Sequence, residues 1–220
     1  MDERAVTDLR ELAERDSELA ERGSRLRALD AEVAAVRARA EAIDAFFAEY
    51  PQEEMRRRET VAAADAELER RRAELAAAES AFAAAREDET RERAETAIER
   101  GRDHVAVATA GLERARAAAA ELERDASALS EELPLLEQRA RRAAVEVPDA
   151  PEPAAGPSGL VEWASHAHAE LFVAAGQLDV QRERVIREAN ELATMLLGEQ
   201  TFGATVEHAL ARVIDMRGGG

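Results

Sequence analysis

Apolar and small residues recur every seven positions through the middle of this chain, and this spacing constrains its fold more than any other sequence feature. Between residues 98 and 136 two such series run together, offset by three positions. One series is Ile98, Val105, Leu112, Ala119, Ala126 and Leu133, and the other is Gly101, Ala108, Ala115, Leu122, Leu129 and Leu136. Positions with this spacing form one narrow stripe on an α-helix, the a and d positions of a coiled coil.

The composition favours long helices over a compact globule. Of the 220 residues, one is tryptophan, one is tyrosine and five are phenylalanine, so little aromatic area is available to fill a large core. Hydrophobic residues make up 46% of the chain, many of them alanine, and charged residues make up 35%. This balance is typical of coiled coils. We therefore predict an all-α protein: an elongated coiled coil, built as a long helical hairpin or bundle, with a C-terminal helical module.

The net charge and the missing residue types restrict the possible functions. The net charge is −17, whereas binding to nucleic-acid phosphates depends on a local excess of Lys or Arg, so we do not expect a nucleic-acid partner. Every basic residue is arginine, which excludes a phosphate-binding loop with its lysine and a Schiff-base lysine. The absence of cysteine excludes thiol nucleophiles, disulfides and thiolate metal sites. We expect a protein that is not an enzyme and that needs no metal or other cofactor.

The sequence predicts neither a targeting segment nor a transmembrane segment. Its first ten residues, MDERAVTDLR, are acidic and polar, whereas a secretory signal would be basic and then apolar. No stretch approaches the roughly 18 uninterrupted apolar residues that a membrane span requires. We expect a cytoplasmic protein whose partner is another protein or a second copy of itself, as a homodimer, with no membrane-surface contact.

We predict that residues 1–144 form long antiparallel coiled-coil helices. Near the start, the second seam position falls on Asp16 and then on Gly23, so we expect this end of the chain to be loosely paired. Pro51 follows three aromatic residues and cannot continue the helical hydrogen-bond ladder, because it lacks a backbone N–H. These features predict a turn near residues 50–52.

A second helix is predicted after Pro51, and its apolar pattern is interrupted at residues 86–95. The series that ends at Phe82 and the series that starts at Ile98 are sixteen positions apart, which is not a multiple of seven. Two interpretations fit: a continuous or bent helix, or a reversal near Thr90 that packs Phe82 back toward the region of Ile98. We favour the continuous or bent helix, because the stretch lacks the Gly or Pro that a tight turn would use.

Prolines mark the clearest domain boundary. Four of the six prolines lie within residues 145–158, which predicts an extended, semi-rigid linker. Residues 159–217 are predicted to form the C-terminal helical module, with Gly198 as a C-cap and Thr201 as the N-cap of a final short helix. Residues 218–220 are predicted to be a disordered tail.

The C-terminal module carries the candidate partner interface. Its helix is the most apolar part of the chain and is too short to bury its own stripe completely. The candidate interface residues are Trp163, Leu171, Phe172, Leu178, Leu196 and Leu197. Two interpretations remain open: these side chains pack the module onto the long helices of the same chain, or they anchor a partner or a second copy.

Two other groups of polar residues were considered as sites. The arginine triplets at 56–58 and 70–72 lie two heptads apart and could bind an acidic partner, but we favour a solvated face neutralised by nearby glutamates at i,i+4 spacing. His166 and His168 are two positions apart and so point to different faces of a helix. Glu162 and Glu170 flank His166 at i,i+4, but dimetal bundles need Glu-x-x-His pairs from two helices, and that spacing does not occur in this sequence. We therefore predict no metal site.

The seam from Ile98 to Leu136 and the Ala/Glu/Arg-rich faces resemble the arm segments of SMC-type chromosome-segregation proteins and other long bacterial coiled coils. The resemblance covers roughly residues 2–144 and lies in composition and heptad pattern. SMC chemistry resides in ATPase heads with a phosphate loop, and this chain lacks that loop, so the resemblance assigns no functional residue. It implies a chromosome-associated accessory factor as an alternative function.

The size and long-helix layout are also similar to the phage-shock and ESCRT-III membrane-remodelling proteins. Those proteins begin with an amphipathic membrane-binding helix, whereas residues 1–20 here are acidic with a sparse apolar stripe. A membrane-surface role is therefore a further alternative. The function that we expect is structural: an elongated spacer or scaffold whose apolar seams select a partner or a second copy.

Overall fold

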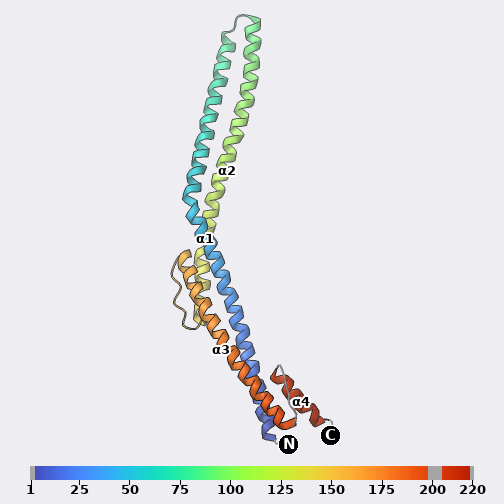
Figure 1. Ribbon diagram of the computed structural model, residues 1–220. Coiled ribbons are helices and arrows are strands. Elements are labelled where there is room, and N and C mark those ends of the chain that lie inside the picture. Colours follow the sequence, from blue (N-terminus) through green and yellow to red (C-terminus); the bar gives the residue numbers. More distant parts are fainter. Residues whose placement is uncertain (1–2, 198–204, 219–220) are drawn as a thin grey trace. The chain divides into compact units, whose positions relative to one another are not determined.

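The computed structural model describes residues 3–197 and 205–218, and the regular secondary structure of these residues is entirely helical. Within them the chain forms α1 (Glu3–Ala84), α2 (Asp88–Glu146), α3 (Pro157–Leu197) and α4 (Val206–Gly218), as labelled in Figure 1. The prediction of an all-α fold with long helices is confirmed for this part of the chain. None of the described helices combines the length and apolar content that crossing a bilayer requires.

The helices are shared between two units. Unit 1 combines Met1–Glu41 with Leu135–Gly220, and unit 2 is Ala42–Pro134. The first half of α1 therefore belongs to unit 1 and the second half to unit 2, and α2 is divided near its C-terminal end.

Unit 2 is a hairpin of two helices with a thin apolar seam. The second half of α1 and most of α2 lie side by side and are joined at one end by a short loop (Figure 1). Asp65 and Arg116 link the two helices across 3.5 Å. Leu68 and Leu112 are buried between them. A Cβ placed on Gly101 would lie 3.0 Å from Leu75 Cδ1, so this glycine lets the two helices approach closely.

The predicted turn near residues 50–52 is wrong, because α1 continues through Pro51. A proline inside a helix costs about 3 kcal/mol, since it removes one hydrogen bond and crowds the preceding turn. Packing of the helical turns that precede Pro51 offsets this cost. Ile43 is fully buried one turn before the aromatic residues, and the rings of Phe46 and Tyr50 lie 5.8 Å apart, directly before Pro51. Local sequence rules identify the proline but not the packing that compensates for it.

The chain reverses at residues 85–87 instead, so the continuous helix that we favoured there is wrong. Glu87 acts as the cap of α2: its carbonyl oxygen accepts hydrogen bonds from the Arg91 N–H at 3.0 Å and from the Thr90 hydroxyl at 2.8 Å. The Arg91 guanidinium lies 5.0 Å from the Phe82 ring centroid, a cation–π contact across the turn. None of residues 85–87 has a positive φ, which explains why the reversal needs no glycine.

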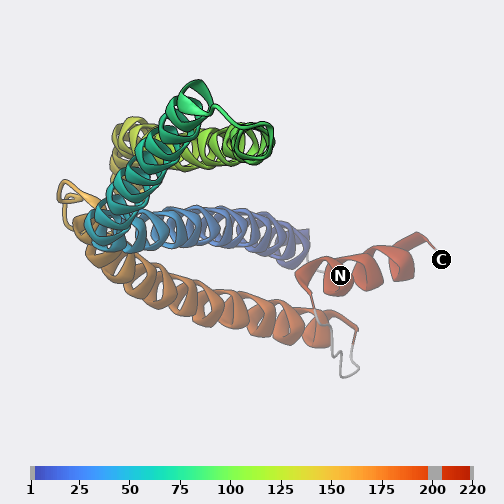
Figure 2. The same ribbon diagram turned by 90° about the horizontal axis from the view of Figure 1, so that it is seen from above.

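Unit 1 is built around α3, which runs antiparallel to the first half of α1 (Figures 1 and 2). One cluster of its core joins the start of α1, the C-terminal half of α3 and α4. Val6, Leu9 and Leu19 of α1 are buried against α3 residues such as Val185 and against Val206 of α4. The loosely paired N-terminal end that the sequence predicts is therefore not observed, because two other helices cover it.

The proline-rich linker predicted at 145–158 is shorter than expected. The segment between α2 and α3 comprises residues 147–156. Pro157 occupies the first turn of α3, where its missing N–H is not needed, and the Leu160 N–H donates to the Gly156 carbonyl at 3.1 Å. Gly156 has φ +87°, and its N–H donates to Glu137 Oε1 at 3.0 Å, which fixes the linker on α2.

Three predictions at the C-terminus fall partly or wholly outside the described residues. The predicted caps, Gly198 and Thr201, both lie outside the described residues. Of the predicted tail at 218–220, Gly218 is the last residue of α4, and the other two residues are outside the described part of the chain.

Helix continuity through Pro51 can be measured directly. Because the chain has no cysteine, spin labels at Ala42→Cys and Thr60→Cys are unique, and both side chains are exposed. Eighteen positions are five helical turns, so the labelled Cα atoms should be about 27 Å apart. Pulsed double electron–electron resonance measures this distance. A separation near 10 Å, as in a hairpin turning at Pro51, would contradict the continuous helix.

The two glycines in unit 2 should respond differently to substitution. Gly111→Ala places its Cβ in open space and should raise the free energy of unfolding by about 1 kcal/mol, through helix propensity alone. Gly101→Leu should lower it by about 1–3 kcal/mol, because the added side chain must displace Leu75. Urea unfolding followed by circular dichroism checks both, and equal responses would show that Gly101 does not mark a close approach.

Candidate protein-interaction surface

The inner face of α3 is joined to α1 by a half-buried ion pair. Arg182 donates from Nε to Asp16 Oδ1 at 2.7 Å and from Nη2 to Oδ2 at 3.5 Å. The Asp16 side chain is 6% exposed, whereas that of Arg182 is 41% exposed. This hydrogen bond, followed by the charge of the carboxylate, raises the pKa of Arg182 above its usual range. Asp16, which interrupts the predicted seam, therefore has a defined partner that sequence spacing alone does not reveal.

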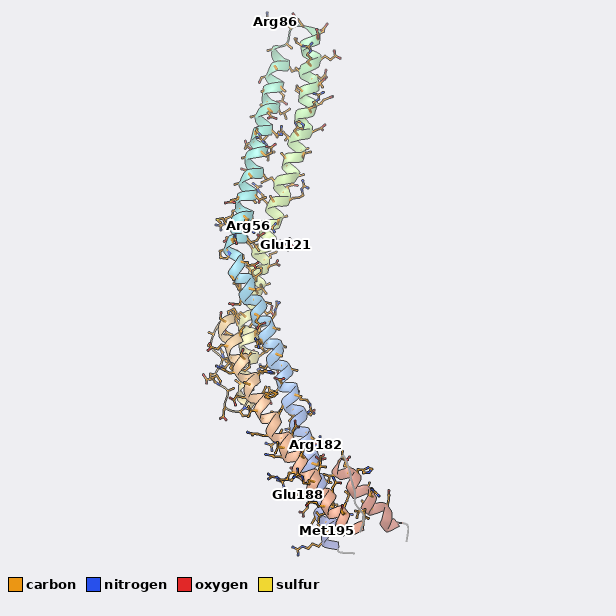
Figure 3. All side chains as sticks on the ribbon, viewed as in Figure 1. Arg56, Arg86, Glu121, Arg182, Glu188 and Met195 are labelled. Carbon is orange, nitrogen blue, oxygen red and sulfur yellow. The ribbon has the colours of Figure 1, made fainter. Side chains whose placement is uncertain are left out.

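A second polar contact between α1 and α3 fits the same register of the two helices. His168 Nδ1 lies 2.6 Å from Asp30 Oδ1. Asp30 is two heptads after Asp16 on α1, and His168 is two heptads before Arg182 on α3. The two helices therefore keep one antiparallel register over this length. Arg182 lies on α3 in Figure 3, with Glu188 and Met195 further along the same helix.

Most of the predicted interface residues pack within unit 1. Trp163 and Leu171 are each only 2% exposed. Leu178, Leu196 and Leu197 are partly buried against the core that α1, α3 and α4 share. Phe172 differs, because its side chain is 76% exposed. Packing inside the chain therefore accounts for five of the six, and Phe172 lies on the solvent-exposed side of α3.

This outer face of α3 carries an apolar patch. Beside Phe172, Val173 is 53% exposed and Val180 is 61% exposed. A shallow hollow between them is centred on Gly176 and rimmed by Gln177 and Arg184. We name Phe172, Val173, Gly176 and Val180 the outer patch. Val173 and Val180 are seven positions apart and belong to a heptad series other than the one that contains Leu171 and Leu178.

The arginine triplets are neutralised locally, as we favoured. Arg56 and Arg57 both pair with Glu53, and Arg58 pairs with Glu54. In the second triplet, Arg70 and Arg71 pair with Glu67, and Arg72 pairs with Glu69. Arg56 is labelled on α1 in Figure 3. Each of these arginines therefore has a carboxylate partner three or four positions away on its own helix.

An open groove lies along unit 1 between α1, the linker and α3. Its volume is about 370 Å³. Its lining residues are Arg22, Arg25, Leu26, Leu29, Glu146, Pro148, Ala174, Gln177, Leu178 and Gln181. Across residues 3–197 and 205–218, no group of three or more His, Asp or Glu side chains is arranged to hold a metal ion.

Comparisons with known protein families, curated proteins and solved structures find no match to this chain.

The Asp16–Arg182 pair should contribute measurably to the stability of unit 1. Arg182→Ala leaves a buried carboxylate without its partner and should lower the free energy of unfolding by about 1–3 kcal/mol. Trp163, the only tryptophan, is buried in unit 1, so its fluorescence during urea unfolding reports on this unit.

A double-mutant cycle isolates the interaction. Asp16→Ala combined with Arg182→Ala should cost less than the sum of the single losses, because no buried charge is left unpaired. Arg142→Ala, at an exposed arginine of the same unit, is the matched control and should change stability by less than about 0.5 kcal/mol. Additive losses would show that the two side chains do not interact.

Proposed function

We propose that this protein is a non-enzymatic helical scaffold: the unit 2 hairpin acts as a spacer, and α3 of unit 1 acts as an association module. The observation that carries the proposal is the outer patch of α3. Its exposed Phe172, Val173 and Val180 lie on a helix whose opposite face is already fully used in packing. A second apolar face on such a helix is typical of a surface that docks another helix.

The geometry of unit 2 supports the spacer role. From Ala42 to Ala84, α1 has 43 residues, which corresponds to about 65 Å of helix. The seam with α2 is narrow and rich in alanine, and most side chains on both helices are exposed. A hairpin of this kind separates its loop at 85–87 from its base, and the hollow between its helices at Val61 and Ala119 is open to solvent.

The side-chain chemistry supports a role without catalysis. The groove along unit 1 is lined by arginine, glutamine and alkyl side chains and one glutamate, with no Ser, Thr, Cys or His among them. A nucleophile beside a base, as covalent catalysis requires, is therefore not part of this groove. The net charge of −17 favours a protein partner over a nucleic acid.

Shortening the hairpin tests the spacer role. Removal of residues 62–75 and 102–115 together takes two heptads from each helix and keeps their seams in phase. The hairpin should then shorten by about 21 Å and stay helical. Dyes at Ala42→Cys and Arg86→Cys report this length by energy transfer, since both positions are exposed and the chain has no other cysteine.

Removal of residues 62–75 alone is the matched control. It leaves α2 two heptads longer than its partner, so helix pairing and thermal stability should fall. If removal from both helices unfolds the hairpin as much as removal from one, unit 2 is not a modular spacer.

A further inference from the structure

We propose that two copies of this chain associate through the outer face of α3, as an antiparallel helix pair with a two-fold axis between Ala174 and Ala175. This inference rests on the proposed function and deepens it by naming the partner of the association module as a second copy.

The outer face carries a second heptad seam, distinct from the one that packs on α1. Its members alternate at four and three positions, the spacing of a and d residues in a coiled coil. All of them are exposed. They are Glu162, His166, Ala169, Val173, Gly176, Val180, Glu183 and Arg187. We name this set the outer seam. Its centre is apolar or small, and its two ends are polar.

In an antiparallel pair, each a residue faces a d residue of the other helix. The residues of the outer seam then face complementary residues of the second copy, layer by layer. Near the axis, Val173 faces Gly176 of the second copy, and Val180 faces its Ala169. Further out, His166 faces Glu183. At the ends, Arg187 faces Glu162. The two-fold symmetry repeats each layer, so apolar residues meet at the centre and opposite charges meet at the ends.

Other arrangements of the same seam are disfavoured by charge. In a parallel pair in register, Arg187 would face Arg187 and Glu183 would face Glu183. An antiparallel shift by one heptad would place Glu183 against Val173 and Arg187 against Ala169. Like charges directly opposite each other, or a charge against an apolar layer, destabilise a helix pair. The outer seam therefore selects one orientation and one register.

Gly176 independently indicates that a second helix packs on this face. Glycine inside a helix costs about 1 kcal/mol relative to alanine. In unit 1 nothing lies within 4 Å of the Cβ that an alanine would add there, so packing within the chain gives no reason for this residue. In the proposed pair, the hollow at Gly176 accepts the Val173 side chain of the second copy and lets the helices approach closely.

Within residues 3–197 and 205–218, the charged ends of the outer seam are also not used in ion pairs. Glu183 and Arg187 are four positions apart, as are Glu162 and His166, yet neither combination forms an ion pair among the described residues. This contrasts with the arginine triplets of α1, where every arginine is paired locally. Charges that have no partner in the described part of their own chain are available to a second copy.

The mass of the full chain in solution tests the proposal. The monomer has a mass of 23.9 kDa, so sedimentation equilibrium should show this value at low concentration and about twice this value at high concentration. The small number of apolar layers predicts a dissociation constant on the order of micromolar. A chain that stays monomeric up to several hundred micromolar would overturn the proposal. The hairpin-shortening result would stand regardless, so the two proposals fail separately.

Substitutions test the interface itself. Val173→Glu places a charge in each central layer and should weaken dimerisation by more than tenfold. Val107→Glu, at a valine of α2 that is 68% exposed, is the matched control and should leave dimerisation unchanged. Both valines are exposed in the monomer, so Trp163 fluorescence should confirm an intact unit 1. A dimer that survives Val173→Glu uses another surface and would overturn the proposal.

A charge exchange tests orientation and register. Arg187→Glu alone and Glu162→Arg alone should each weaken dimerisation at least tenfold, since like charges then face each other at both ends. The double variant restores opposite charges and should recover affinity to within about threefold of the unmodified chain. Failure of the double variant to recover, when both single variants are weakened, would exclude the antiparallel register.

Discussion

The structure depends on one constraint: an apolar stripe on a long helix must be covered along its whole length by other helices. The stripe of α1 is covered by α3 within unit 1 and by α2 within unit 2. Because alanine occupies many seam positions, each layer buries little surface, and an alanine in place of leucine loses roughly 2 kcal/mol of transfer free energy. Stability therefore accumulates over many layers, and a local defect such as Pro51 is tolerated inside α1.

The same constraint explains which features could be predicted from the sequence. Heptad spacing and composition predict the all-α fold, and clustered prolines predict the linker, since both depend on local chemistry. The site of reversal could not be predicted in this way. At Pro51 the local rule was overruled by the packing of the preceding turns of α1. At residues 85–87 the turn uses the Glu87 cap and the Arg91–Phe82 contact, and neither involves the glycine or proline that local rules look for.

The candidate interface shows a second limit of sequence patterns. Leu171 and Phe172 are neighbours in the chain and similar in hydrophobicity, yet one is 2% exposed and the other 76% exposed. Spacing identifies residues suited to a seam, but it does not show which of two seams on one helix the chain itself occupies. Only the position of α1 against α3 separates them. Sequence patterns alone therefore place Trp163 and Leu171 in one interface with Phe172 and leave Val173 and Val180 out of it.

Alanine-rich seams have a further consequence for specificity. Small side chains fit one another in several registers, so the apolar layers alone select a register weakly. Asp16 of α1, which pairs with Arg182 on the inner face of α3, restricts the register of these two helices. A shift of one heptad would place its buried carboxylate against Ala175 or Ala189 in place of Arg182, and an unpaired buried charge costs several kcal/mol. One polar residue within a seam therefore supplies the register that many alanines cannot. The charged ends of the outer seam are placed to do the same for a second helix, so α3 combines weak, adaptable apolar layers with a few charges that decide alignment.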